Sequence, residues 1–124
     1  MTADQLDQFT RAYAVAALWS STDDEGEPLD KGRHCDDIAP DALAAMAADC
    51  AKFQADNAKL LTRAMEHTGH DLTQAGHDFW LTRNGHGAGF WDGDWKPFGD
   101  LLTDAAKAFP EVDLYVGDDG LIHA

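Results

Sequence analysis

Apolar side chains recur at helical spacing in the first twenty residues. Their positions alternate in steps of three and four, which predicts an amphipathic helix over residues 4–20: Leu6, Phe9, Tyr13 and Ala16. Residues 21–37 show no such period and contain two glycines and a proline, so they predict a loop. That loop holds seven acidic residues against two basic ones.

A second apolar stripe predicts a long helix from Pro40 and Asp41 to about His67. It repeats in steps of three and four over three heptads: Leu43, Met46, Cys50, Phe53, Asn57, Leu60 and Ala64. Oppositely charged residues alternate on the outer face, so this helix is nearly charge-balanced. The stripe is expected to pack on the first helix or to form the interface of a homodimer; a monomer and a dimer both remain open.

The second half of the chain predicts strands and one more helix. The runs HDFWLTR and AGFWD flank Asn84–Gly87, whose Asn-Gly step is typical of a hairpin turn. An amphipathic helix is expected over 98–109 and a second hairpin over 112–124. The predicted fold is a single α+β domain, residues 1–124, in the order α-α-β-β-α-β-β. A helical pair would pack on a small, mostly antiparallel sheet of about four strands.

In that hairpin, alternation places Trp80 and Trp91 on the face opposite Phe79, Leu81 and Phe90. Together with the last hairpin, the first of these faces collects aromatic and acidic side chains: Trp80, Trp91, Tyr115, Asp78 and Asp113. Aromatic residues rimmed by carboxylates are typical of protein-binding surfaces. The alternative is that another element covers this face and the tryptophans belong to the core.

Net charge excludes some partners. Nine basic residues face 23 acidic ones, a formal charge of −14. Such a chain is repelled by nucleic-acid phosphates and by anionic lipid, so neither is expected as a direct partner. Genomic bias, salt adaptation and imitation of a nucleic-acid backbone all remain possible causes. Under the last of these, the loop acids are candidate contacts with a basic protein: Asp23, Asp24, Glu25, Glu27, Asp36 and Asp37.

Catalytic and metal motifs are missing from the sequence. Ser20 and Ser21 are the only serines, and neither lies in a nucleophile elbow. The histidines lack the spacing of a zinc site, no phosphate-binding loop occurs, and no cofactor is expected. Without a secretory signal or a membrane span, the chain is expected to be cytoplasmic, with reduced cysteines. An alternative ligand site would use polar residues around the glycine-rich hairpin 83–92: Arg83, Asn84, His86 and Asp92.

The segment AGHDFWLTRNGHGAGFWDGDW, with YVGDDG near the end, resembles a family of small proteins encoded by phages, prophages and plasmids. AALWS in the first helix and IAP before the long helix extend the resemblance over nearly the whole chain. It implies a mobile-element accessory protein active in the host cytoplasm, and carries over no catalytic residue.

Three hypotheses follow. The first is a non-enzymatic inhibitor or modulator that binds a basic host or competitor protein, in the manner of DNA mimics directed against restriction or CRISPR machinery. The second is a small enzyme or ligand-binding module at residues 83–92. The third is a phage scaffold or dimerisation protein.

Overall fold

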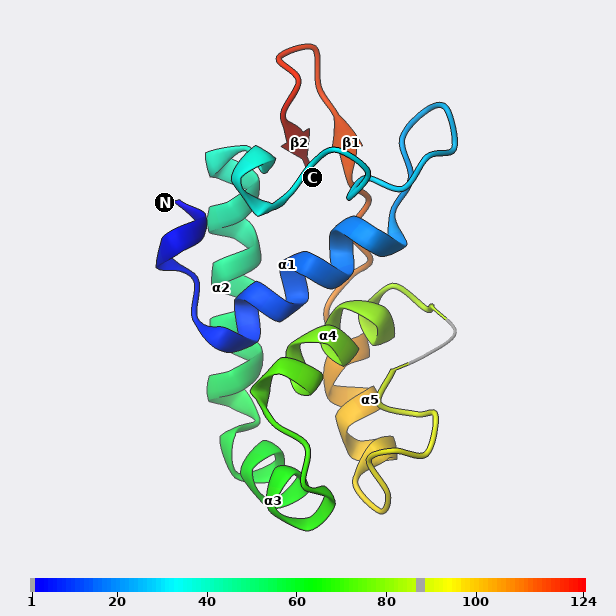
Figure 1. Ribbon diagram of the computed structural model, residues 1–124. Helices are drawn as coiled ribbons and strands as arrows, with labels where there is room; N and C mark the ends of the chain where they lie inside the picture. The colour runs from blue at the N-terminus through cyan, green and yellow to red at the C-terminus, as the bar shows by residue number, and fades with distance from the viewer. Residues whose placement is uncertain (1, 87–88) are drawn as a thin grey trace.

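The computed structural model describes residues 2–86 and 89–124 and is mainly helical (Figure 1). Two 3-10 helices precede α1 and α2 respectively: η1 (Ala3–Gln5) and η2 (Cys35–Asp37). The α-helices of the described residues are α1 (Gln8–Ser20), α2 (Pro40–Asp56), α3 (Ala58–Thr68), α4 (Leu72–Arg83) and α5 (Gly99–Lys107). Strands β1 (Tyr115–Val116) and β2 (Ile122–His123) pair antiparallel. The α+β class is confirmed, but with two short strands in the described residues rather than about four.

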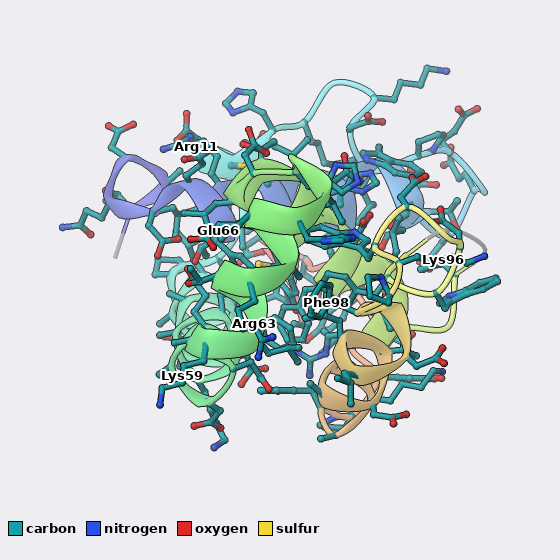
Figure 2. All side chains as sticks on the ribbon, turned by 90° about the horizontal axis from the view of Figure 1, so that it is seen from below. Arg11, Lys59, Arg63, Glu66, Lys96 and Phe98 are labelled. Carbon is teal, nitrogen blue, oxygen red and sulfur yellow. The ribbon has the colours of Figure 1, made fainter. Side chains whose placement is uncertain are left out.

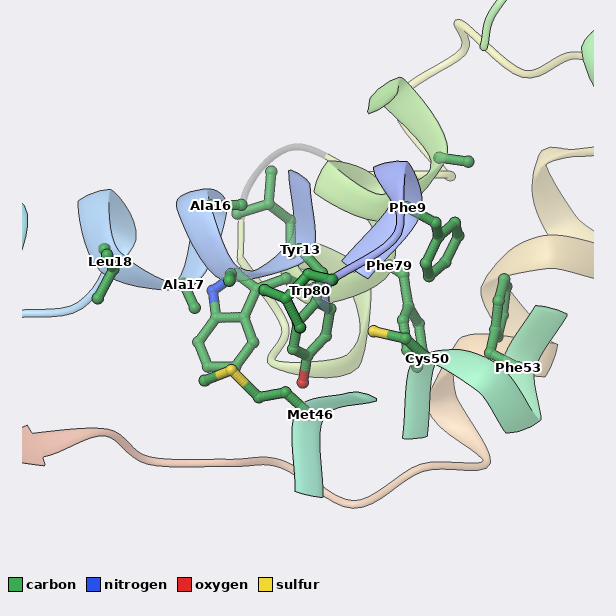
Figure 3. Packing of buried hydrophobic residues seen from close by; sticks show 14 of the residues in the cluster. Phe9, Tyr13, Ala16, Ala17, Leu18, Met46, Cys50, Phe53, Phe79 and Trp80 are labelled. Atoms are coloured by element: carbon green, nitrogen blue, oxygen red, sulfur yellow. The ribbon is translucent and has the colours of Figure 1, made fainter. Parts of the chain in front are cut away.

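Helices α1 and α4 form the closest helix pair, and Gly76 makes this possible (Figure 1). A Cβ atom at Gly76 would collide with the carbonyl group of Phe9, so a glycine is needed where the two backbones approach. Aromatic rings fill the space around this contact (Figure 3). Tyr13 meets Trp80 edge-on with ring centroids 5.3 Å apart, and Phe53 of α2 stacks on Phe79 at 4.3 Å. These contacts make the α1–α4 layer the centre of the core.

The predicted first hairpin is wrong, because residues 77–83 belong to α4. Asp71 caps this helix, its side chain accepting a hydrogen bond from the backbone N–H of Gln74 at 3.0 Å. From Ala75 to Arg83 every residue except His77 is buried. A helix buried on all sides has no polar face, so its sequence lacks the 3.6-residue period that reveals an amphipathic helix. Its short aromatic run therefore resembles a strand.

The residues after α4 form turns that fold back onto it. Gly85 has φ +70°, as the expected tight turn requires, whereas Gly87 and Ala88 of the predicted hairpin lie outside the described residues. Gly89 packs closely against Thr82, whose hydroxyl accepts a hydrogen bond from the N–H of Phe90 at 3.0 Å. These contacts join the loop to the helix.

The predicted long helix divides into α2 and α3 at Asn57. The Asn57 side chain and backbone N–H both donate to the carbonyl of Phe53, at 2.9 and 3.1 Å, while the Asn57 backbone leaves helical geometry at φ −122° and ψ 23°. Leu43, Met46, Cys50, Phe53 and Ala64 are buried as predicted, but beyond the break Leu61 is buried in place of Leu60. An unbroken seam for dimerisation is therefore absent from this part of the chain, and Leu43 and Phe53 already pack inside it.

The predictions of an amphipathic helix over 98–109 and of a hairpin at the end of the chain agree with the structure. The helix expected over 98–109 is α5, and the last hairpin turns at Gly117–Gly120, where Gly120 has φ +79°. The backbone N–H of Ala39 donates to the carbonyl of Ile122 at 2.8 Å, and Ile38 bridges to Ile122. The end of the acidic loop is thereby joined to the terminal hairpin. Among the helices described here, none has both the length and the apolar character needed to cross a membrane.

Candidate functional site

Acidic side chains concentrate at one end of the molecule, which we call the acidic end. Figure 1 shows the loop after α1, the start of α2 and the β1–β2 hairpin at that end. Residues 21–41 and 113–119 contribute eleven carboxylates: Asp23, Asp24, Glu25, Glu27, Asp30, Asp36, Asp37, Asp41, Asp113, Asp118 and Asp119. The same segments hold two basic residues, Lys31 and Arg33, while the other twelve acids share the rest of the chain with seven bases.

The opposite end of the molecule has mixed charge. Figure 2 looks onto α3, where Lys59 and Arg63 lie beside Glu66. On α2, Lys52 pairs with Asp56 at 2.8 Å, and Asp49 pairs with the buried Arg83 at 2.9 Å. The negative charge is therefore unevenly distributed between the two ends.

The acidic loop has a defined backbone. Thr22 bridges to Pro28, and the backbone N–H of Leu29 donates to the carbonyl of Ser21 at 2.9 Å. The Asp23 carboxylate accepts hydrogen bonds from the N–H groups of Glu25 and Glu27 at 2.9 and 3.0 Å. These contacts order the backbone that carries the neighbouring acidic side chains.

The six loop acids proposed for binding divide into two groups. Asp23 and Asp37 are partly buried and bond to backbone N–H groups, Asp37 to that of His34 at 2.9 Å. The other four point into solvent: Asp24, Glu25, Glu27 and Asp36. Both basic residues of the loop are engaged with its acids, Lys31 with Glu27 at 3.1 Å and Arg33 with Asp23 at 3.9 Å. The exposed charge of this loop is therefore mostly carboxylate, with Lys31 as an exposed cation paired to Glu27.

The terminal hairpin extends this surface. Tyr115 is exposed and stacks on His123 with ring centroids 5.5 Å apart, and Asp113 is also exposed. Hydrogen bonds from the His123 ring and from the N–H of Leu121 lower the pKa of Asp119. Asp119 thus remains charged to lower pH than an ordinary aspartate.

The predicted face of Trp80, Trp91 and Tyr115 does not form, because α4 replaces the first strand. Trp80 is 1% exposed and donates a hydrogen bond to the Ser20 hydroxyl at 2.6 Å. Trp91 is 50% exposed, but it lines a hollow with Lys96, Gly99 and Asp100 rather than with the hairpin. Of the three aromatic residues, only Tyr115 belongs to the acidic end.

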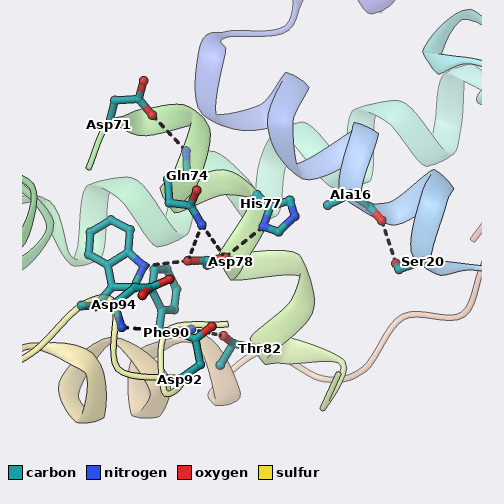
Figure 4. A network of polar contacts seen from close by, with 11 residues as sticks. Ala16, Ser20, Asp71, Gln74, His77, Asp78, Thr82, Phe90, Asp92 and Asp94 are labelled. Carbon is teal, nitrogen blue, oxygen red and sulfur yellow. Dashed lines mark hydrogen bonds and ion pairs between the residues drawn. The ribbon is translucent and has the colours of Figure 1, made fainter. Parts of the chain in front are cut away.

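Asp78, expected at the rim of that face, is buried and links α4 to the loop before α5 (Figure 4). Its carboxylate accepts hydrogen bonds from the Trp95 indole at 2.6 Å and from the Gln74 amide at 3.0 and 3.1 Å. The Nδ1 atom of His77 lies 2.9 Å from the same carboxylate. Three side chains thus satisfy the buried carboxyl group, which indicates a structural role.

The alternative ligand set is also dispersed. The Arg83 side chain is buried and bonds to the Pro110 carbonyl, the Tyr13 hydroxyl and Asp49 at 2.6 to 3.1 Å. The Asn84 amide bonds to the Trp80 carbonyl and to the N–H of Val112 at 3.0 and 2.7 Å. Asp92 is exposed on another turn, and only Asn84 and His86 line a common cleft.

That cleft has a volume of about 260 Å³ and lies between the ends of α1 and α4 and the segment before β1. Its lining consists mostly of polar residues: Ser20, Ser21, Thr22, Trp80, Asn84, His86, Glu111, Val112, Asp113 and Leu114. The sequence did not single out Ser20–Thr22 or Glu111, because three distant segments build the cleft. Its only local signals are the helix ends at Ser20 and Arg83.

Trp19 is an exposed aromatic residue that the sequence did not single out. Trp19 is 44% exposed and stacks on His77 with ring centroids 5.6 Å apart. In α1 it lies off the stripe formed by Phe9, Tyr13 and Ala16, so helical phase could have identified it as a surface tryptophan.

Neither cysteine has the character of a nucleophile. Burial raises the pKa of the thiols of Cys35 and Cys50, so both favour the unreactive protonated form. Both are free thiols. Residues 2–86 and 89–124 also contain no group of three or more potential ligands placed to hold a metal ion. Comparisons with protein-family models, with curated proteins and with solved structures gave no match.

Proposed function

We propose that this chain is a mobile-element accessory protein that acts by binding a basic protein through its acidic end. Its partner would be a nucleic-acid-binding or defence protein of the host or of a competing element, inhibited or modulated in the host cytoplasm. The proposal rests on one observation: eleven carboxylates gather on an ordered loop, the start of α2 and residues 113–119, and the loop is joined to the terminal hairpin. A dense field of one sign attracts an oppositely charged partner and accelerates the encounter.

The finer form of the proposal is DNA mimicry. Proteins that bind duplex DNA expose basic surfaces matched to closely spaced phosphates. Five exposed carboxylates lie within thirteen residues of the loop, and residues 113–119 add Asp113, Asp118 and Asp119 beside the exposed Tyr115. An aromatic side chain among these charges would supply the anchor that charge alone lacks.

The experiment compares two variants with the same change in charge. The acidic-end variant neutralises four exposed residues whose side chains make no hydrogen bond to other described residues: D24N, E25Q, D30N and D118N. The control variant neutralises one glutamate and three aspartates elsewhere, all exposed: E66Q, D94N, D100N and D104N. Each protein is immobilised and exposed to a bacterial lysate, and bound proteins are eluted with salt or with duplex DNA.

We expect the wild-type protein and the control variant to retain the same basic proteins, released by duplex DNA. The acidic-end variant should retain at least about tenfold less of these proteins. Equal retention by both variants would show that net charge, and not the acidic end, is responsible. Retained proteins that DNA does not displace would contradict the mimic form while leaving protein binding in place.

A further inference from the structure

The cleft beside the acidic end is held open by hydrogen bonds between all three of its walls. The Trp80 indole donates to the Ser20 hydroxyl, which itself donates to the Ala16 carbonyl at 2.7 Å. The Asn84 amide joins the end of α4 to the N–H of Val112. Ser20, Trp80 and Asn84 therefore use their polar atoms to build the cleft. The groups available to bind a ligand are therefore the remaining side chains of the lining.

Those groups are negative or neutral. Glu111 and Asp113 line the cleft, and neither carboxylate forms an ion pair or hydrogen bond with another described residue. No lysine or arginine is part of the lining. Helices α1 and α4 both end here, at Ser20 and Arg83. The last carbonyls of α4 mostly accept hydrogen bonds from residues 84–86, so the partial negative charge of a helix C-terminus comes mainly from α1. The cleft therefore favours a cation over an anion or a neutral group.

Size and donor geometry narrow the class of cation. Sites for cofactors and drug-sized ligands measure roughly 300–1,000 Å³, so a cleft of about 260 Å³ suits a single side chain. His86, Glu111 and Asp113 do not form a metal-binding group. A guanidinium presents five N–H donors in a plane and can serve two carboxylates and a hydroxyl at once, whereas an ammonium is a point charge with three donors.

We propose that this cleft receives an arginine side chain of the basic partner. The inference rests on the proposed function and deepens it, since Asp113 belongs to both the cleft and the acidic end. In this arrangement the acidic end attracts the partner over a distance, and the cleft fixes one of its arginines. The exposed loop acids would contribute mainly to the rate of association, and Glu111 and Asp113 to the lifetime of the complex.

The direct test needs no partner. A short blocked peptide, Gly-Arg-Gly, is titrated into 15N-labelled protein and followed by NMR, beside peptides with lysine or the neutral isostere citrulline. We expect the arginine peptide to shift the indole N–H signal of Trp80 and the amide signals of residues 111–114. The lysine peptide should bind at least fivefold more weakly and citrulline should not bind. Equal affinity for lysine or citrulline would overturn the assignment to arginine.

The matched variants locate the site. E111Q/D113N removes the two cleft carboxylates, and D94N/D104N removes two exposed carboxylates elsewhere. We expect the first pair to weaken the arginine peptide about tenfold and the second by less than twofold. Equal loss of affinity in the two variants, or signal shifts spread over the whole acidic loop, would mean that the peptide is attracted by the overall negative charge and does not bind at the cleft.

Partner capture then separates this inference from the proposed function. E111Q/D113N should release the captured partner faster than the D94N/D104N protein does. If the acidic-end variant loses the partner while E111Q/D113N retains it and the peptide fails to bind, the arginine cleft is refuted and binding through the acidic end stands. If no variant affects capture although the peptide binds at the cleft, the proposed function fails and the cleft remains.

Discussion

Between α1 and α4, Phe9, Tyr13, Phe79 and Trp80 pack with ring centroids 5.3 to 5.9 Å apart and are almost inaccessible to solvent. At the acidic end, five of the loop carboxylates face solvent on a short segment whose two basic residues are already paired. The first region is dense in aromatic residues, and the run HDFWLTR within α4 resembles part of a binding motif in sequence. The second has the ordinary composition of a polar loop. Unusual residues thus serve packing, and ordinary ones carry the exposed chemistry.

This difference means that one region should determine stability and the other recognition. Substitutions in the α1–α4 layer are expected to lower the free energy of unfolding, with effects on binding only through loss of structure. Substitutions at the acidic end are expected to change binding while the fold persists. The following predictions test this division, beginning with the largest effect.

Trp80→Ala should lower the free energy of unfolding by about 3–5 kcal/mol, because it removes a fully buried indole and leaves the Ser20 hydroxyl without its donor. Trp91→Ala is the matched control: that indole is 50% exposed, and its loss should cost less than about 0.5 kcal/mol. Urea denaturation followed by circular dichroism measures both. Similar losses in the two variants would contradict the division between a buried and an exposed tryptophan.

Gly76→Ala tests the contact between α1 and α4 without removing any side chain. In an exposed helix this change is stabilising, since alanine has the higher helix propensity. Here the added methyl group would collide with the Phe9 carbonyl, and we expect a loss of about 1–3 kcal/mol. The control is Gly69→Ala, which has φ +80° with open space around it, so any loss there reflects backbone strain alone. A more stable Gly76→Ala variant would refute the close helix contact.

The elements that sequence predicted correctly are those with one polar face. Helices α1 and α5 show an apolar stripe at 3.6-residue spacing, and the terminal hairpin has a turn at Gly117–Gly120 between apolar runs. Helix α4 has no polar face because α1, α5 and the loop before α5 surround it, so its periodicity gives no information. The break at Asn57 is a local change of backbone conformation at one residue, which a stripe of apolar residues does not reveal.

The candidate site was predictable only in part. Net charge and the seven acids of residues 23–37 are visible in sequence, and so is the loop that carries them. The cleft is not, because Ser20, His86 and Glu111 come together only through the packing of α1 on α4 and of the segment before β1 on both. Strand alternation assigned Trp80 and Tyr115 to one face. The same packing instead places Trp80 in the core and Tyr115 on the surface of the terminal hairpin.

Not every carboxylate acts through its exposed charge, and Asp7 shows the difference. It caps α1, accepting a hydrogen bond from the N–H of Thr10 at 2.8 Å. Partial burial works to raise the pKa of Asp7, but the hydrogen bonds from Thr10 and Gln54 outweigh it and lower the pKa. Asp7→Ala should therefore reduce stability by about 1 kcal/mol at neutral pH, and Asp7→Asn by less, since an amide oxygen also caps a helix.

The pH dependence of this contribution follows from the direction of the shift. A lowered folded-state pKa gives stability that is present above the unfolded value of about 4 and is lost as pH falls through the folded value. The difference in stability between wild type and Asp7→Ala should thus shrink below about pH 4. Urea midpoints at pH 7, 5 and 3 measure it. A difference that persists unchanged at pH 3 would mean that Asp7 acts through packing and not as a charged cap.

At the acidic end the sign should be reversed. The exposed carboxylates repel one another without compensating hydrogen bonds, so neutralising four of them is expected to stabilise the fold slightly, by less than about 1 kcal/mol. Added salt should stabilise the wild-type protein more than the acidic-end variant, because screening removes the same repulsion. The control variant, with the same net charge but its changes elsewhere, should gain less stability at low salt.

Thermal melts of the three proteins at about 10 and 500 mM salt, where the screening lengths differ several-fold, measure this effect of charge on stability. If the acidic-end variant is the least stable of the three, its carboxylates hold the loop in place, and its loss of binding must then be attributed to loss of structure rather than of charge.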